Sequence, residues 1–178
     1  MLVTGPPGVG KTTLMLKLES YCRGRGWKLG GMVTREVRKS SERVGFRLRD
    51  ISSGKEGWLA KKNEGGGPRI GGYSVVTADL ETIGVDALEA AAEDGPDIVL
   101  VDEIGPMEMT SQKFRYAVSA LLDSGKIMVA TVRFGTNYKE LEAASTRADT
   151  MNITLTRENR EASLNLIASR IEDWLSRS

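Results

Sequence analysis

The segment over residues 5–13 constrains this chain more than any other stretch. It fits the pattern G-x-x-x-x-G-K-[ST] at every fixed position, after a short β-branched run and before an apolar helix. Glycines in such a loop let backbone N–H groups turn toward phosphate oxygens, where a Cβ would intrude. A chance glycine-rich turn is the alternative, but the flanking strand and helix favour a phosphate-binding loop. The loop consists of Gly5, Pro6, Pro7, Gly8, Val9, Gly10, Lys11, Thr12 and Thr13.

Two side chains of this loop have predicted roles. We expect Lys11 to reach the β- and γ-phosphates of a nucleoside triphosphate as a mobile positive charge, beside the amide groups at the start of the helix. We expect the Thr12 hydroxyl to ligate the Mg²⁺ that accompanies such a nucleotide. The loop therefore predicts a nucleotide-binding protein with Mg²⁺ as its cofactor.

A second motif follows a run of four apolar residues over 98–101. Such a run is typical of a parallel strand that is buried on both faces. It ends in Asp102 and Glu103, and two carboxylates there are costly unless they face a cation or water. Asp102 is the predicted Mg²⁺ ligand, usually through water. Glu103 is the predicted catalytic group that orients or deprotonates the attacking water, although it could instead cap a helix or pair with an arginine.

The absence of histidine narrows the chemistry that can accompany these motifs. It excludes Ser-His-Asp and Cys-His pairs and histidine metal sites, so catalysis must use carboxylates, Lys, Arg, backbone amides and a bound ion. Cys22 is the single cysteine, which rules out an internal disulfide and fits a reducing cytoplasm. The formal net charge of +1 indicates no nucleic-acid site, and no apolar stretch is long enough to span a membrane.

Strand and helix patterns alternate along the rest of the chain, apart from one antiparallel β-meander at about residues 30–80. This order predicts one α/β domain over residues 1–178, with a largely parallel sheet and ligands at the carboxyl ends of its strands. Helices are predicted after the phosphate loop, over 83–94, from 110 or 111 to 125, over 137–148 and from 156 onward. Strands are predicted over 1–4, 27–37, 44–50, 57–60, 73–77, 98–103, 127–132 and 151–155.

Several charged or polar positions keep two interpretations. The arginines of the meander either form a solvated strand face or contact a triphosphate or partner; they are Arg35, Arg38, Arg43, Arg47 and Arg49. The segment over residues 65–72 is either a passive loop or a lid that carries Arg69 toward the phosphates. Thr131 either senses the γ-phosphate or the attacking water, or is a plain strand residue. Arg133 either stabilises transition-state charge or lies free on the surface.

The ordered motifs resemble those of the small nucleoside-triphosphatases first described from thermophiles, whose animal relative is called cancer-related nucleoside-triphosphatase. The specific part is V-D-E-I-G-x-M-E, which begins at Val101. The resemblance implies a RecA-like phosphate-loop fold, a three-layer α/β sandwich. It also implies slow, Mg²⁺-dependent hydrolysis of several nucleoside triphosphates, ATP and GTP among them, with CTP and UTP expected too. The matching residues are 5–13, 34–38, 44–46, 72–73, 101–105 with Met107 and Glu108, 130–131 and 156–160.

The resemblance assigns phosphate binding to residues 8–13, Mg²⁺ to Asp102 and water activation to Glu103. It places Asn159 and Arg160 near the base, although capping of a helix by Thr156 explains part of that motif. The chain also departs from the family pattern. Relatives often have two glutamates in place of Arg35-Glu36, a lysine in place of Pro106, and Ile-Pro in place of Val132-Arg133. The last two changes lie near the expected phosphate end, so base preference and turnover can differ from those of relatives.

Two other functions compete with hydrolysis. A nucleoside or nucleotide kinase needs an acceptor site and usually an arginine-bearing lid, whereas the insertion here is predicted to form strands. A nucleotide-dependent switch would use slow hydrolysis as a timer and the arginine-rich meander as a partner surface.

Overall fold

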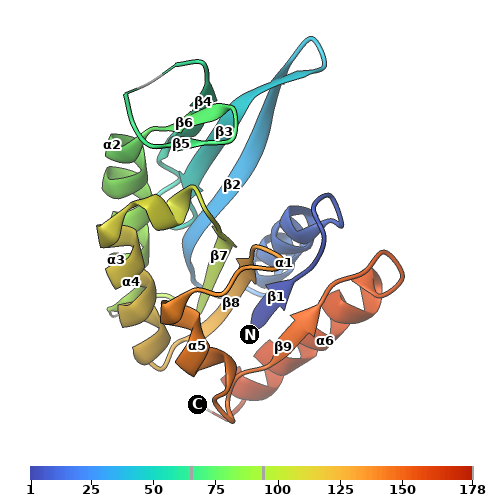
Figure 1. Cartoon of the computed structure of the whole chain (residues 1–178). Coiled ribbons are helices and arrows are strands. Elements are labelled where there is room, and N and C mark those ends of the chain that lie inside the picture. Colours follow the sequence, from blue (N-terminus) through green and yellow to red (C-terminus); the bar gives the residue numbers. More distant parts are fainter. Residues whose placement is uncertain (65, 94, 178) are drawn as a thin grey trace.

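The computed structural model describes residues 1–64, 66–93 and 95–177. Gly65, the first residue of the suggested lid, and Asp94, the predicted end of a helix, lie outside the described residues. Among the described residues the strands form one nine-stranded sheet in the order β5-β6-β4-β3-β2-β7-β8-β1-β9. Figure 1 shows helices on both faces of this sheet.

Half of the sheet is parallel, as the apolar runs predicted. The strands within this half pair in parallel with one another, and β8 lies between the strand that precedes the phosphate loop and the strand that carries the acidic pair. Two central strands are buried on both faces, which explains their unbroken apolar sequences. The parallel strands are β1 (Leu2–Thr4), β2 (Leu29–Lys39), β7 (Ile98–Ile104), β8 (Ile127–Val132) and β9 (Asn152–Thr154).

The other half is antiparallel and confirms the predicted meander. It extends from β2 through three successive antiparallel pairings. The short edge strand β5 was not predicted; it holds Arg69 and pairs with β6, so this part of the 65–72 segment belongs to the sheet. The antiparallel strands are β3 (Glu42–Asp50), β4 (Glu56–Lys62), β5 (Arg69–Ile70) and β6 (Tyr73–Val75).

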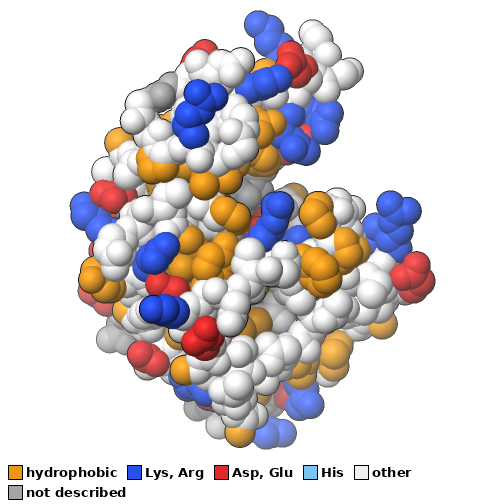
Figure 2. Space-filling view, viewed as in Figure 1, with side chains coloured by type: hydrophobic (Ala, Val, Ile, Leu, Met, Phe, Trp, Pro, Cys, Tyr) orange, Lys and Arg blue, Asp and Glu red, His pale blue; other side chains and the backbone are white. Residues whose placement is uncertain are grey.

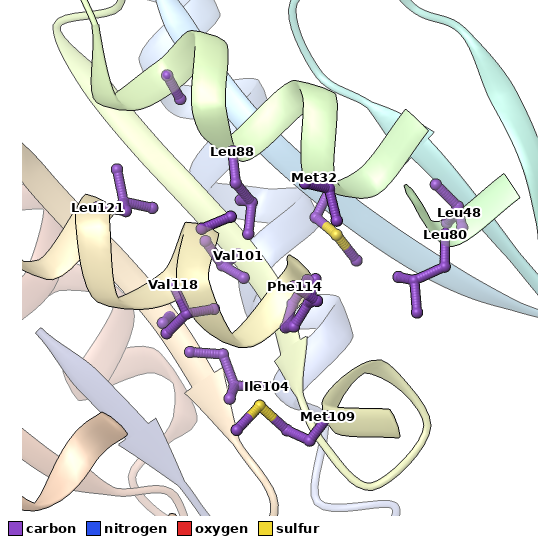
Figure 3. Packing of buried hydrophobic residues seen from close by; sticks show 14 of the residues in the cluster. Met32, Leu48, Leu80, Leu88, Val101, Ile104, Met109, Phe114, Val118 and Leu121 are labelled. Carbon is purple, nitrogen blue, oxygen red and sulfur yellow. The ribbon is translucent and has the colours of Figure 1, made fainter. Parts of the chain in front are cut away.

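Helices complete the three layers. One face of the sheet packs against α1 (Lys11–Gly24) and α6 (Arg160–Leu175), through a core that includes Met15 and Ile171. The other face packs against α3 (Asp86–Ala92), α4 (Gln112–Asp123) and α5 (Lys139–Ser145). Figure 3 shows part of this second core, in which Phe114 lies between residues of the sheet and of the helices. The fold is the three-layer α/β sandwich that the sequence predicted.

Several predicted boundaries were wrong. The helix predicted from residue 83 begins at Thr77, as α2 (Thr77–Asp79) followed by the π-helical turn η1 (Leu80–Val85). The last helix begins at Arg160 instead of Thr156, because Thr156 and Asn159 close a turn before it. The Asn159 backbone N–H donates to the Thr156 hydroxyl, and the Asn159 side-chain oxygen accepts from the Thr156 backbone. The helix α4 starts as predicted, since the Ser111 hydroxyl accepts from the Phe114 N–H.

Candidate nucleotide site

The phosphate loop and the acidic pair meet at the carboxyl ends of the parallel strands. The loop connects β1 to α1. The acidic pair lies near the end of β7, which is followed by the short 3₁₀ helix η2 (Glu108–Thr110). Figure 1 places these strand ends below the overhanging meander, and the molecular surface is hollowed between the two (Figure 2). This is the place where ligands bind in open α/β sheets.

Three glycines of the loop are required, for two different reasons. Gly8 and Gly10 have φ angles of 73° and 106°, which side chains with a Cβ rarely adopt. An ideal Cβ on Gly5 would lie 2.6 Å from the Leu155 carbonyl oxygen, which follows β9. The absence of a Cβ at Gly5 therefore lets the loop pack against the residue after the last strand. The positive φ angles at Gly8 and Gly10 let the backbone N–H groups form an anion cradle.

Lys11 is almost buried at the first position of α1, with 8% of its surface exposed. Its Nζ donates a hydrogen bond to the Gly5 carbonyl oxygen at 3.0 Å, so the side chain folds back across the loop. The same Nζ lies 3.8 Å from Oε2 of Glu103. The structure thus brings together the cation of the loop and the second carboxylate of the acidic pair.

Asp102 is fully buried beside the loop. Its Oδ1 accepts a hydrogen bond of 2.6 Å from the Thr131 hydroxyl, and Oδ2 has no hydrogen-bond partner among the described residues. Burial raises the pKa of this carboxyl to about 6, although hydrogen bonding from Thr131 and from Thr12 favours its charged form. The Thr131 hydroxyl therefore bonds to Asp102 in this structure. The suggested role of Thr131 in binding the γ-phosphate or the attacking water stays a prediction.

These residues fit the group that the motif implies. A buried carboxylate oxygen without a partner, next to the Thr12 hydroxyl, is a costly arrangement unless a cation or water binds there. In the described part of the chain, no three His, Cys, Asp or Glu side chains could hold a metal ion by themselves. Mg²⁺ is usually bound by one or two protein oxygens together with water and substrate phosphates.

A third carboxylate, Glu108, lies close to Glu103 of the acidic pair. No role was predicted for it from the sequence. It is 4% exposed, and burial raises its pKa to about 8, with further increases from the charges of Glu103 and Asp102. An ideal Cβ on Gly105 would lie 3.0 Å from Oε2 of Glu108 and 3.1 Å from Oε1 of Glu103. The sequence signal was its place as the last residue of the V-D-E-I-G-x-M-E motif, just after the acidic strand.

Other sequence candidates lie at the margin of the site. Arg133 directly follows β8 and is exposed; its backbone N–H donates to the Ile104 carbonyl oxygen. Arg160, the first residue of α6, donates from Nε to the Val9 carbonyl oxygen at 2.7 Å and so holds the phosphate loop from outside. The Asn159 side chain is used within its own turn, where its amide nitrogen also donates to the Thr154 carbonyl oxygen.

The meander arginines are paired with carboxylates. Arg35 and Arg47 both approach Glu56, and Arg38 and Arg43 both pair with Glu36. Arg49 pairs instead with Glu19 of α1, at 2.7 Å, and ties the meander to that helix. This pairing supports the interpretation as a charged strand face.

Two cavities lie near opposite ends of the parallel strands. One of about 410 Å³ touches Met1, Ile127 and Met151, at the amino ends of the strands and away from the phosphate loop. The other, of about 270 Å³, lies near the carboxyl ends.

Within the described ranges, no helix is both long and apolar enough to cross a membrane.

The sequence matches the model of a protein family described as NTPase over residues 1–168. It is 42% identical to the nucleoside-triphosphatase THEP1 of Thermofilum pendens over 177 residues, which is 99% of this chain and 97% of that protein. It is 40% identical to the protein of the same name from Thermotoga maritima, over 95% of this chain and 93% of the relative.

Solved structures show the same likeness. The crystal structure of THEP1 from Aquifex aeolicus superposes with a TM-score of 0.82 at 32% identity, covering 97% of this chain and 98% of the other. The solution structure of a human cancer-related nucleoside triphosphatase superposes with a TM-score of 0.81 at 33% identity, covering 97% of each chain.

Proposed function

Because the chain belongs to this NTPase family and is a nucleoside-triphosphatase, we propose that it hydrolyses several nucleoside triphosphates in a Mg²⁺-dependent reaction. The observation that carries the proposal is the approach of Lys11 to Glu103 beside the buried Asp102. A cation for the phosphates and a carboxylate for water are within 4 Å of each other, next to a carboxylate suited to a metal ion.

In the proposed reaction, the amides of residues 8–13 and Lys11 hold the β- and γ-phosphates. Asp102, oriented by Thr131, and the hydroxyl of Thr12 would hold Mg²⁺, which would supply positive charge to the phosphate oxygens when bound. Glu103 accepts a hydrogen bond from the attacking water, orients it toward the γ-phosphorus and takes its proton, while the bond from the γ-phosphorus to the β,γ-bridging oxygen breaks and the nucleoside diphosphate leaves. Lys11 then stabilises the negative charge that develops on the transferred group.

The test is phosphate release from ATP, GTP, CTP and UTP by the unmodified protein and by Glu103→Gln. We expect release from all four nucleotides by the unmodified protein, loss of release in EDTA, and recovery with Mg²⁺. The substitution is expected to lower kcat by at least about 100-fold, because general-base catalysis contributes at least that much, while nucleotide affinity stays similar. Glu89→Gln, at an exposed position of α3, is the matched control.

Three outcomes would contradict parts of the proposal. Unchanged turnover in Glu103→Gln would remove the role assigned to that residue. Full activity in EDTA would remove the metal requirement. Phosphate transfer that occurs only when a nucleoside or monophosphate acceptor is present would identify a kinase instead.

A further inference from the structure

The cavity near the carboxyl ends of the strands lies beside the start of the phosphate loop, because Thr4, which lines it, directly precedes Gly5. Its walls come from β1, β9 and the segment over residues 133–138 that follows β8. Thr4 and Thr154, the last residues of β1 and β9, line it, and the loop begins at the next residue, Gly5. A molecule held by its phosphates in the loop therefore has this cavity within reach of its remaining part.

The walls of the cavity combine an aromatic ring with hydroxyl groups. Phe134 lines the cavity and is 50% exposed, and it belongs to neither buried core. Thr4 and Thr154 are register partners in neighbouring parallel strands, so their side chains leave the sheet on the same face. A flat, partly apolar ligand with polar edges fits such a site, because the ring offers a stacking surface and each hydroxyl can donate or accept.

Asn159 and Arg160, at the start of α6, are the residues that the family resemblance places near the base, and both have hydrogen-bond partners in the structure. The Asn159 amide group closes the turn before α6. Arg160 donates to the Val9 carbonyl oxygen of the phosphate loop. Arg160 therefore contacts the phosphate loop and Asn159 its own turn, and neither of them lines the cavity beside Phe134.

We propose that this cavity receives the nucleobase, which stacks on Phe134 and presents its polar edge to Thr4 and Thr154. The inference rests on the proposed function and adds to it the residues that recognise the base. Because a hydroxyl can be either donor or acceptor, this pair can accept the edges of different bases, as the proposed hydrolysis of several nucleoside triphosphates requires. Phe134 would set affinity for the nucleoside part, while the loop sets affinity for the phosphates.

The test compares ligands with and without a base. Dissociation constants are measured by calorimetry, with Mg²⁺, for the β,γ-methylene analogues of ATP and GTP and for inorganic tripolyphosphate. Phe134→Ala is expected to raise the constants for both analogues at least about fivefold, as loss of base stacking does elsewhere. The constant for tripolyphosphate should stay within about twofold of the unmodified protein, since that ligand has no base. Phe134→Trp should restore analogue binding.

Tyr116→Ala is the matched control, because this exposed aromatic residue lies on α4 outside the cavity. Equal analogue affinity in Phe134→Ala and the unmodified protein would overturn the base site, and so would an equal loss for analogues and tripolyphosphate. A protein that binds no analogue would overturn it as well. Phosphate release by the unmodified protein, measured on the same sample, reports on the proposed function separately, so a protein that hydrolyses ATP can still refute the role of Phe134.

Discussion

At the scale of single residues, the burial of Glu108 strongly changes the pH at which its carboxyl loses a proton. A carboxyl with a pKa of about 8 keeps its proton in the folded protein at pH values where the unfolded chain, with a pKa near 4.5, has lost it. The folded state therefore binds more protons between these two values, and the free energy of unfolding falls as pH rises through this window. The slope from one such group is at most about 1.4 kcal/mol per pH unit.

Glu108→Gln is expected to remove this part of the pH dependence. Glutamine has nearly the same shape and stays neutral, so the variant should match the unmodified protein near pH 4.5 and be more stable than it at pH 8 and above. Urea unfolding followed by circular dichroism across this range measures the difference. Glu89→Gln should leave the curve unchanged, and parallel curves for Glu108→Gln and the unmodified protein would show that the buried carboxyl is already charged at neutral pH.

At the scale of elements, the start of α6, which follows β9, contacts the phosphate loop, while the strand with the acidic pair, β7, lies on the other side of β1. Arg160 is the contact, through its hydrogen bond to the Val9 carbonyl oxygen, and its guanidinium also lies against Gly10. The helix begins only after the turn between Thr156 and Asn159. Arg160 is therefore the first residue of α6, and at this position it contacts the loop.

Arg160→Ala is expected to loosen the loop and to weaken binding of every ligand that has phosphates. Because the residue is largely exposed, the effect should be modest, about three- to tenfold in the dissociation constant, and it should be similar for tripolyphosphate and for nucleotide analogues. Calorimetry measures this, with Arg157→Ala in the same segment as control. A loss confined to ligands with a base would instead place Arg160 beside the nucleobase.

At the scale of the whole molecule, local patterns predicted what depends on neighbouring residues in the chain. The strand over residues 127–132 and the capped start of α4 at Ser111 follow from periodicity and capping, and both are confirmed. The phosphate loop and the pair Asp102-Glu103 were found by motif, and the fold brings Lys11 and Glu103 together. Their predicted roles remain to be tested.

Features that depend on tertiary packing were not predictable from the sequence. The burial of Glu108, which is charged and polar by residue type, is seen only in the folded chain. The edge strand β5 forms because β6 offers a partner, and two residues carry too little pattern to reveal it. The cavity beside Phe134 joins three separate segments, so no single stretch of sequence indicates it.

The two halves of the sheet differ in how far apart along the chain their partners lie. In the antiparallel half, Lys39 pairs with Glu42, whereas in the parallel half Leu2 pairs with Asn152. Contacts between distant residues cost more loop-closure entropy, so local hairpins form first. We expect pulsed hydrogen exchange during refolding to protect β3 and β4 before β1 and β9, and simultaneous protection would contradict this order. The edge of the nucleotide site formed by β1 and β9 would then be completed last, so a newly made chain would acquire its meander before it could hydrolyse its substrate.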